Sequence, residues 1–501
     1  MRKICQIGLP IFLVSLLTVA ASAQSFMVQC PTSTLTHPVA ANNNSEPAYT
    51  SATAVNGAIK CQQISGGDGF ATMGDGSQTY MFSFGPLSGL AKMANGEAGT
   101  DFPYEFNVVA PITLVPGDPA TTVEGGGTFT YNGAVGLAPD TDHGNAINGH
   151  VDPRPIMDVG VMNGNIPAPL MAIDEDDEFF LTLTNVGQVM RPDLFEQHTV
   201  HFHGYPNASA FYDGVPDASV AINIGGSFTY YYLAPDAGTY FWHCHITPPE
   251  HLQMGMVGQL YVRPRQNRVP AGGDLYAALQ TQQTNLRTKC DSSDILCSNP
   301  LPAVNTAATA AAGVKYAYND GDGTTAYDVE IPLQIHGFDP NFHFVGMTFN
   351  PENFTGMKDK FFLLNGRSYP DTVTAGPIAT QSTDGLMHYS QPMPAIINIP
   401  AGQRALLRIS DLDVTEYQTL ASQGIPMLVI GYNAKLLRDQ AGNNLYYKTN
   451  SITLAGGESL DVILDTAGIP VGTYYLYTPN LDHLSNDAEN FGGLMTEVRV
   501  N

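Results

Sequence analysis

Basic residues are scarce in this sequence, with 21 Lys and Arg against 46 Asp and Glu, and the net charge is −25. An acidic surface is repelled by nucleic acid and by anionic membranes, so we expect neither as a partner. Phosphate-binding glycine loops and a Ser-His-Asp signature are also missing from the sequence. These absences leave an acidic protein that could attract cations, and its 501 residues are enough for two or three domains.

Long apolar runs are missing after the first 23 residues. The segment 1–23 begins with two basic residues, continues with an apolar run and ends in Ala21-Ser22-Ala23. This pattern is typical of a secretory signal peptide that is removed after Ala23, with an uncleaved membrane anchor as the alternative. We therefore expect an exported protein, in the periplasm, on the outer surface or in the extracellular space, whose mature chain does not span a membrane.

Cysteine is also rare, with six residues, of which Cys5 lies in the expected signal peptide. The remaining five are an odd number, which leaves one thiol over in an oxidising compartment. Proximity along the chain suggests two disulfides: Cys30–Cys61 and Cys290–Cys297. Cys244 is then the unpaired cysteine, and it stands directly between His243 and His245.

Helical signals are few, whereas Gly (50 residues) and Pro (35 residues) are abundant and separate short segments of alternating polarity. Such alternation places apolar side chains on one face of a strand. The clearest examples are four segments: 179–185, 227–233, 406–410 and 460–464. We therefore predict an all-β fold of sandwiches or barrels.

An internal repeat organises these strands. Residues 225–242 resemble 456–476, and 176–185 resemble 401–410 at a similar offset, which predicts two copies of one β domain. The first copy begins near 76–85, and a Gly-, Ala- and Asp-rich insertion interrupts it. The predicted boundaries are as follows: 24–265 for an N-terminal extension and the first domain, with the insertion at about 90–155; 266–325 for a linker; and 326–501 for the second domain.

Histidines and the free cysteine concentrate in two segments, HTVHFHG (198–204) and FWHCHITPPEHLQMGM (241–256). Successive side chains of a strand point to opposite faces. If the two segments are neighbouring strands, Cys244 shares a face with His198. A second group then lies behind them on the opposite face: His201, His203, His243 and His245.

The front group gains two further members from the loop after Cys244, namely His251 and Met256. Two His, one Cys and a distant Met form the ligand set of a blue-copper electron-transfer site, in which the thioether tunes the potential. Met254 is an alternative axial ligand. The competing interpretation is a buried apolar cysteine with histidines that satisfy loop hydrogen bonds.

At these residues the sequence resembles the multicopper oxidases, strongly over 160–265 and weakly over 395–501. HTVHFHG is similar to their H-P-x-H-x-H-G segment, and HCHITPPEHLQMGM to their H-C-H-x3-H-x3-G-[LM] segment with two extra residues. The resemblance implies tandem cupredoxin-like Greek-key β-barrels and an oxidoreductase. Its type 1 copper ligands would be these residues: His198, Cys244, His251 and Met256. Its type 2/type 3 copper ligands would be these: His201, His203, His243 and His245.

The same resemblance implies an electron route. Single electrons from a small molecule, a metal ion or a redox protein would enter at type 1 copper and pass through Cys244 to His243 and His245. Dioxygen is the expected acceptor at the second copper site. Within this scheme Cys244 and its two histidine neighbours are the expected catalytic residues.

One departure from the family is specific. A trinuclear centre takes eight histidines from two domains, but the second copy has LYTP (476–479) in place of WHCH and LVIG (428–431) in place of HFHG. The other histidines are scattered: His37, His143, His150, His336, His343, His388 and His483. Three alternatives remain: another subunit completes the set, as in a homotrimer; isolated histidines such as His483 or His336 join it; or the rear site holds fewer coppers.

A second resemblance, to copper nitrite reductases, is weaker. The spacing of His198 and His203 and the pair His243–Cys244 fit that family too. Its third type 2 ligand would fall on Pro479, which offers no donor atom. We therefore predict an exported multicopper oxidase-type enzyme. The alternatives are a type 1 copper electron-transfer or copper-binding protein without oxidase activity, or a nitrite reductase-like enzyme.

Overall fold

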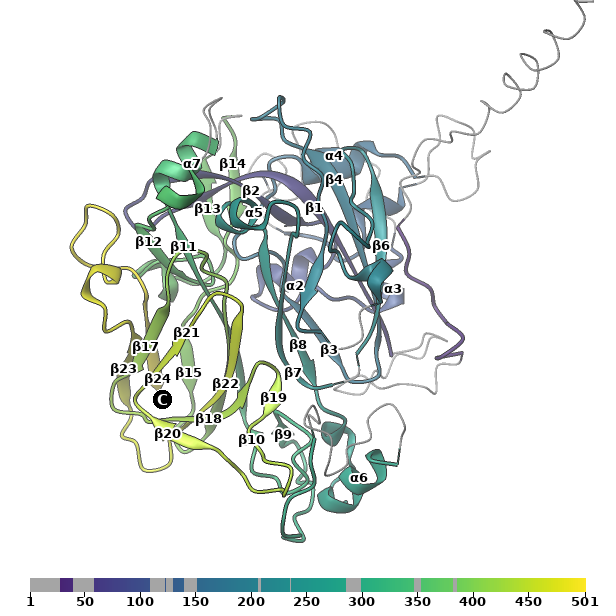
Figure 1. Cartoon of the computed structure of the whole chain (residues 1–501), viewed down its shortest axis with the longest axis vertical. Coiled ribbons are helices and arrows are strands. Elements are labelled where there is room, and N and C mark those ends of the chain that lie inside the picture. The colour runs from purple at the N-terminus through teal and green to yellow at the C-terminus, as the bar shows by residue number, and fades with distance from the viewer. Residues whose placement is uncertain are drawn as a thin grey trace, which may run out of the picture.

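Two β-sandwiches side by side make up most of the chain (Figure 1). The structure is a computed structural model, and it describes the following residues: 28–38, 58–108, 122, 129–138, 151–205, 209–234, 236–284, 299–346, 353–381 and 385–501. The predicted signal peptide and the predicted pair Cys290–Cys297 lie outside the described residues. No helix among the described residues is long and apolar enough to cross a membrane.

The first half of the chain forms two four-stranded sheets. One has the order β2 (Gln78–Pro86), β1 (Ile59–Thr72), β4 (Glu178–Gly187) and β6 (Ser227–Leu233). The other has the order β3 (Met171–Asp174), β8 (Val257–Arg263), β7 (Gly238–His243) and β5 (His201–His203). Alternate residues of β4 (Phe179, Leu181 and Leu183) are fully buried in a core that both sheets supply.

The second half is built in the same way. Its larger sheet has the order β12 (Phe361–Leu364), β11 (Val329–Phe338), β16 (Arg404–Asp411), β22 (Glu458–Asp465), β18 (Met427–Tyr432) and β19 (Lys435–Leu436), with β20 (Tyr447–Thr449) paired to β18. Its smaller sheet has the order β15 (Ile397–Ile399), β24 (Met495–Val500), β23 (Gly472–Tyr477), β17 (Gln418–Ser422) and β21 (Ser451–Leu454). Their shared core is aliphatic.

Strand pairing shows that the two halves are copies of one design. In the first, β1 runs parallel to β4, which pairs antiparallel with β6. In the second, β11 runs parallel to β16, which pairs antiparallel with β22. The order β3-β8-β7-β5 likewise matches β15-β24-β23-β17, with the same strand directions. The predicted all-β fold of tandem sandwiches is confirmed.

Short helices occupy the part of the first half where the sequence predicts an insertion. They are α2 (Leu90–Ala94), α3 (Pro103–Phe106) and α4 (Arg154–Gly160). Their buried side chains Leu90, Ile156 and Val159 pack with Val186 of β4. The sequence predicts that the first copy starts near 76–85, but strand β1 (Ile59–Thr72) comes before that segment. Strand β1 lies inside the sheet, between β2 and β4, so it belongs to the first copy.

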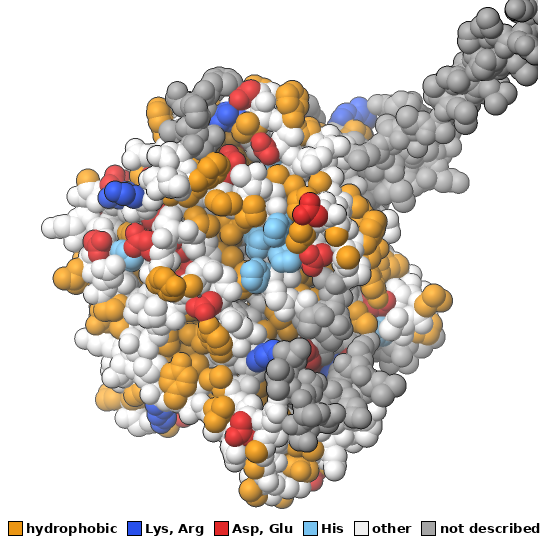
Figure 2. Space-filling model, in the orientation of Figure 1, with side chains coloured by type: hydrophobic (Ala, Val, Ile, Leu, Met, Phe, Trp, Pro, Cys, Tyr) orange, Lys and Arg blue, Asp and Glu red, His pale blue; other side chains and the backbone are white. Residues whose placement is uncertain are grey.

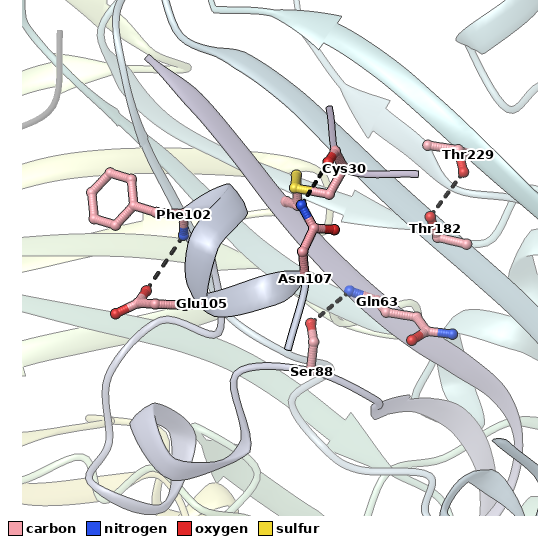
Figure 3. The surroundings of a disulfide bond; sticks show 9 residues. Cys30, Gln63, Ser88, Phe102, Glu105, Asn107, Thr182 and Thr229 are labelled. Carbon is pink, nitrogen blue, oxygen red and sulfur yellow. Dashed lines mark hydrogen bonds between the residues drawn. A yellow bond between two sulfur atoms is a disulfide. The ribbon is translucent and has the colours of Figure 1, made fainter. Parts of the chain in front are cut away.

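A disulfide attaches the N-terminal segment to β1. Cys30 and Cys61 are bonded, as their proximity predicts. Figure 3 shows the Asn107 side chain, which follows α3, donating a hydrogen bond to Cys30 O, 2.9 Å away. Cys244 is free and buried. Among the described cysteines the predicted division into one bonded pair and one free thiol is therefore correct.

The described part of 266–325 contacts both halves. It contains α6 (Leu275–Gln282) and β9 (Lys315–Tyr316), and β9 pairs with β10 (Ala326–Tyr327), which directly follows the segment. Buried Asn319 donates to Glu175 Oε2 of the first half, 2.7 Å away, and Asp322 accepts from Arg438 of the second, also 2.7 Å away. These contacts give the connection between the sandwiches an ordered structure of its own.

Strands β7 and β8 of the first half pack on β16 and β22 of the second. Thr239 Oγ1 donates to Asp461 Oδ1, 2.6 Å away, and Ser459 Oγ donates to Thr239 O, 2.7 Å away. Gly238 adopts φ 149°, and a side-chain carbon there would lie 2.6 Å from Ala434 Cα of the second half. Glycine is thus required for this approach. The interface sets which face of β7 meets the second half.

Candidate metal centres

Both predicted clusters are built around the end of β7. Strand β5 pairs with β7 so that His201 lies opposite His243. The strand ends at His243, after which the Cys244 N–H donates to Met256 O, 3.2 Å away. Alternation of side chains then sends Cys244 into the core of the first sandwich and His243 toward the second half.

The front cluster lies in that core. His198, Cys244 and His251 are fully buried, and their donor atoms lie within 4.8 Å of one another. His251 comes from helix α5 (Pro248–Gln253), which starts with two prolines, residues favoured in the first turn. His251 Nδ1 lies 3.2 Å from Cys244 Sγ. The ring centroids of His198 and His251 are 5.4 Å apart. The Thr199 N–H also points at the sulfur, 3.4 Å away.

Met256 lies beside this cluster. It is fully buried, as is Met254, in the same core as Cys244. A side-chain carbon added at Gly66 would lie 2.7 Å from His198 Cδ2 and 3.5 Å from Met256 Cε. His198 and Met256 therefore meet next to Gly66, and any larger residue there would intrude on both. The structure brings all four predicted front residues together.

The front residues fit a copper ion. Neither ring nitrogen of His198 has a hydrogen-bond partner among the described residues, although the side chain is fully buried. A buried polar group without a partner is costly, and metal coordination would remove that cost. A thiolate, two imidazoles and a thioether are soft and borderline donors, a combination that favours copper over Mg²⁺ or Ca²⁺.

Electrostatics keep the thiol in its metal-binding form. Burial alone would raise the pKa of Cys244, but the adjacent positive charge of His251 outweighs it and holds that pKa well below the usual range. Burial would likewise lower the pKa of His251, but the thiolate and nearby carboxylates raise it to about 10. The metal-free cluster is thus a thiolate–imidazolium pair, and a metal ion would take the place of the proton.

Glu196 is a member of the front site that the sequence did not indicate. Its Oε2 lies 3.5 Å from His251 Nε2, the ring atom that faces away from Cys244. The His251 side chain is fully buried, whereas 23% of the Glu196 side chain is exposed. A carboxylate therefore stands between the buried imidazole and solvent. In the sequence, only its position two residues before His198 could have indicated that Glu196 belongs to the front site.

The rear cluster contains the other four predicted histidines. The His201 ring centroid lies 5.7 Å from His203, 5.2 Å from His243 and 5.1 Å from His245. Donor atoms of the first three lie within 4.8 Å of one another, and His245 stands at the margin of the group. His243 is buried, while the others are partly or fully accessible. Figure 2 shows histidine side chains together at the surface, near the middle of this face.

Hydrogen bonds orient the rear imidazoles. His201 Nδ1 donates to Asp213 O, 2.6 Å away, and His243 Nδ1 donates to Cys244 O, 2.8 Å away. Each bond leaves Nε2 free as a metal donor. Burial and the neighbouring histidines lower the pKa of His203 to about 4 and that of His243 to about 3. These low pKa values favour the neutral form of His203 and His243, which is the form that binds metals.

The second half offers no histidines in the equivalent positions. Strand β17 has the place of β5, and Ala421 lies opposite Tyr477 as His201 lies opposite His243. The sequence comparison that set HFHG against 428–431 was wrong, because those residues form β18 of the other sheet. Cys244 corresponds to Thr478 by the same register. At these positions the second half has Ala421, Tyr477 and Thr478, none of which is a histidine or a cysteine.

A pocket separates the rear cluster from the second half. Its volume is about 490 Å³. The first half lines it with His203, His243, Phe241 and the start of α5, and the second half with residues 412–417 and 455–457. Both halves of the same chain therefore line the pocket.

The two clusters lie in a fold of the cupredoxin type. The fold agrees with solved structures: a blue copper oxidase from Nitrosomonas europaea has a TM-score of 0.50 at 17% identity, over 88% of this chain and 85% of that one. The multicopper oxidase family model matches residues 147–267, which hold both clusters. This part of the chain is therefore similar to a multicopper oxidase domain.

Curated relatives match the same part of the chain. Laccase abr2 of Aspergillus fumigatus is 34% identical over 109 residues, covering 21% of this chain and 17% of the laccase. Multicopper oxidase MmcO of Mycobacterium tuberculosis is 32% identical over 133 residues, 23% and 25% of the two chains. A copper-containing nitrite reductase of Rhizobium meliloti is 32% identical over 117 residues, 22% and 28%. The matches thus span less than a third of these relatives.

Proposed function

We propose that this protein is a copper-dependent oxidoreductase of the multicopper oxidase type, with dioxygen as the electron acceptor. One observation carries the proposal: Cys244 belongs to the front cluster through its sulfur, while its neighbour His243 belongs to the rear cluster. The two candidate metal sites are therefore joined by one peptide unit. Copper, when bound, would supply reversible one-electron chemistry at both sites.

Two separate groups of residues would hold the two kinds of copper site. His198, Cys244, His251 and Met256 would hold type 1 copper in a buried site that excludes water and keeps its geometry fixed. The rear cluster would hold type 2/type 3 copper with these residues: His201, His203, His243 and His245. Because the rear histidines border an open pocket, a small acceptor can reach them from solvent.

Three further features of the proposal follow from the sequence. The electron donor is a small molecule, a metal ion or a redox protein. The signal-like segment 1–23 implies export to the periplasm, the outer surface or the extracellular space. A homo-oligomer, with a trimer as the simplest form, would bring further histidines to the rear cluster if the complete family centre is present.

Copper loading tests the function. The copper-loaded protein is expected to show the intense thiolate-to-copper absorption and to consume dioxygen in the presence of a generic phenol. Removal of copper by a chelator is expected to abolish both, and re-addition to restore them. A loaded protein without that absorption would contradict the front-site assignment. Absorption without dioxygen uptake, whatever the donor, would leave the electron carrier or the nitrite reductase as the function.

Nitrite reduction is the second candidate, because a nitrite reductase matches this region about as well as the oxidases do. The two activities differ in acceptor. With the same reduced donor, an oxidase consumes dioxygen and ignores nitrite, whereas a nitrite reductase does the reverse under anaerobic conditions. Measuring donor oxidation with each acceptor separately decides between them.

Glu196→Gln is expected to raise the reduction potential of front-site copper. Removing a negative charge 3.5 Å from the His251 imidazole makes the more positive oxidised state less favourable. The charge is partly exposed, so we expect an effect of roughly 1 kcal/mol, or about 40 mV for one electron. Potentiometric titration of the thiolate-to-copper absorption measures it. Glu489→Gln, at an exposed position of the second half, is the control and should leave the potential unchanged.

A further inference from the structure

The side of the pocket opposite the rear histidines, here called the pocket wall, lacks the additional histidines that a trinuclear centre requires. Across the pocket stand residues 412–417 and 455–457, whose side chains include Asp413 and Glu416 but no histidine. A carbon added at Gly457 would lie 3.9 Å from His203 Nε2, so this wall reaches the cluster directly. On the side of His203 and His243, the second half of the same chain thus faces the cluster without offering an imidazole.

The isolated histidines near this wall have other contacts. His336 Nδ1 donates to Leu412 O, 3.0 Å away, which fixes its ring behind the wall. His483 lies between Gln418 Oε1 and Glu416 Oε2, at 3.0 and 3.1 Å, and stacks on a phenylalanine ring. Neither histidine lines the pocket. The alternative that they complete the rear set is therefore disfavoured.

The rear nitrogens themselves converge on one point. His203 Nδ1 lies 3.3 Å from His243 Nε2, and His203 Nε2 faces away toward Gly457. Two imidazole nitrogens on one tetrahedral metal ion are about 3.3 Å apart when each bond is about 2.0–2.1 Å long. His201 presents its free Nε2 to the same group, because its Nδ1 is bonded to Asp213 O.

We infer that the rear cluster is a mononuclear site: one copper ion held by His201, His203 and His243, with an open position toward the pocket. His245 is not one of this donor set, although its ring lies 5.1 Å from that of His201 and 5.7 Å from that of His243. This inference rests on the proposed function, because it assumes copper in the front site. It replaces the expected three rear coppers by one, which gives two coppers per chain.

Copper content and electron paramagnetic resonance test this on the full-length, copper-loaded protein in its native oligomeric state. We expect two coppers per chain, and a spin count for oxidised protein that equals the total copper, because two separate Cu(II) ions are both visible. A coupled copper pair would be silent in this measurement. In protein that shows the front-site absorption, any total other than two per chain, or a spin count below the total, would overturn the inference.

Matched histidine variants locate the second ion. His203→Gln is expected to reduce the content to one copper per chain, with the front-site absorption unchanged, which also shows that the variant is folded. His483→Ala removes a buried histidine near the pocket wall and should retain two coppers. A loss of copper in His483→Ala, or its retention in His203→Gln, would contradict the assignment. If the front absorption itself is missing from wild-type protein, the proposed function fails rather than this inference.

Discussion

Cys244→Ser is expected to abolish the thiolate-to-copper absorption of the copper-loaded protein completely. A serine hydroxyl keeps its proton at physiological pH and is a hard oxygen donor, so it cannot replace the thiolate on copper. The buried environment holds the pKa of Cys244 low through the charge of His251, and serine has no ionised form that this charge could stabilise. Oxidation of any donor should fall more than about 100-fold, beyond the usual effect of changing a residue that merely supports a metal ligand.

Met254→Leu is the matched control for Cys244→Ser. It changes a fully buried sulfur-containing side chain in the same core while conserving volume, which cores tolerate well. Met254→Leu should keep both the absorption and the reduction potential of front-site copper. Met256→Leu should keep the absorption but change the reduction potential, because the axial ligand tunes that potential. Retention of the absorption in Cys244→Ser would refute the assignment of the front site. The reverse pattern for the two methionines would transfer the axial role to Met254.

Strand parity explains why both clusters could be predicted from sequence. In HTVHFH and WHCH the period of two fixes which side chains share a face, and the pairing of β5 with β7 is a local consequence of two apolar strands. The fold class follows from the same alternation, as in β4, where Phe179, Leu181 and Leu183 are buried. These features depend only on neighbours along a strand.

Features that depend on contacts between residues far apart in the sequence could not be predicted from the sequence. Glu196 meets His251 only because the chain brings the loop before β5 against α5, and no periodicity marks it. The pocket wall at 412–417 and 455–457 depends on how the two sandwiches pack. The comparison of HFHG with 428–431 was wrong for a related reason: a run of apolar residues with a glycine is typical of many strands, and only hydrogen-bond register showed that β17 is the counterpart.

The interface that positions β7 depends on a buried ionic group centred on Arg408. Its Nε donates to Glu330, 2.7 Å away, and its guanidinium also lies 3.4 Å from Asp461 and 3.3 Å from Thr239 of the first half. Burial alone would raise the pKa of Glu330, but Arg263 and Arg408 lower it to about 2. Among the described residues, Arg408 is the one side chain that contacts both carboxylates, while Arg263 also pairs with Glu330, and Thr239 and Tyr318 also donate to Asp461.

Arg408→Met is expected to lower the free energy of unfolding by about 3–5 kcal/mol, the usual cost of leaving buried charges without their partner. Trp242, the single tryptophan and a residue of β7, reports unfolding of the first half by fluorescence, while circular dichroism reports both halves. Both denaturation midpoints should fall. Arg499→Met, which removes a 45% exposed arginine paired with Glu497, should cost less than about 1 kcal/mol.

The pH dependence of stability gives the same interaction an independent readout. The lowered pKa of Glu330 means that its contribution is fully present above its ordinary value of 4.5 and is lost as the pH falls toward about 2. Wild-type protein should therefore lose stability across this window more steeply than Arg408→Met, in which the pKa of Glu330 is no longer lowered by two arginines. Equal slopes, or a variant as stable as wild type at neutral pH, would show that the other contacts of β7 and β8 join the halves. The orientation of the rear histidines toward the pocket would then not rest on Arg408.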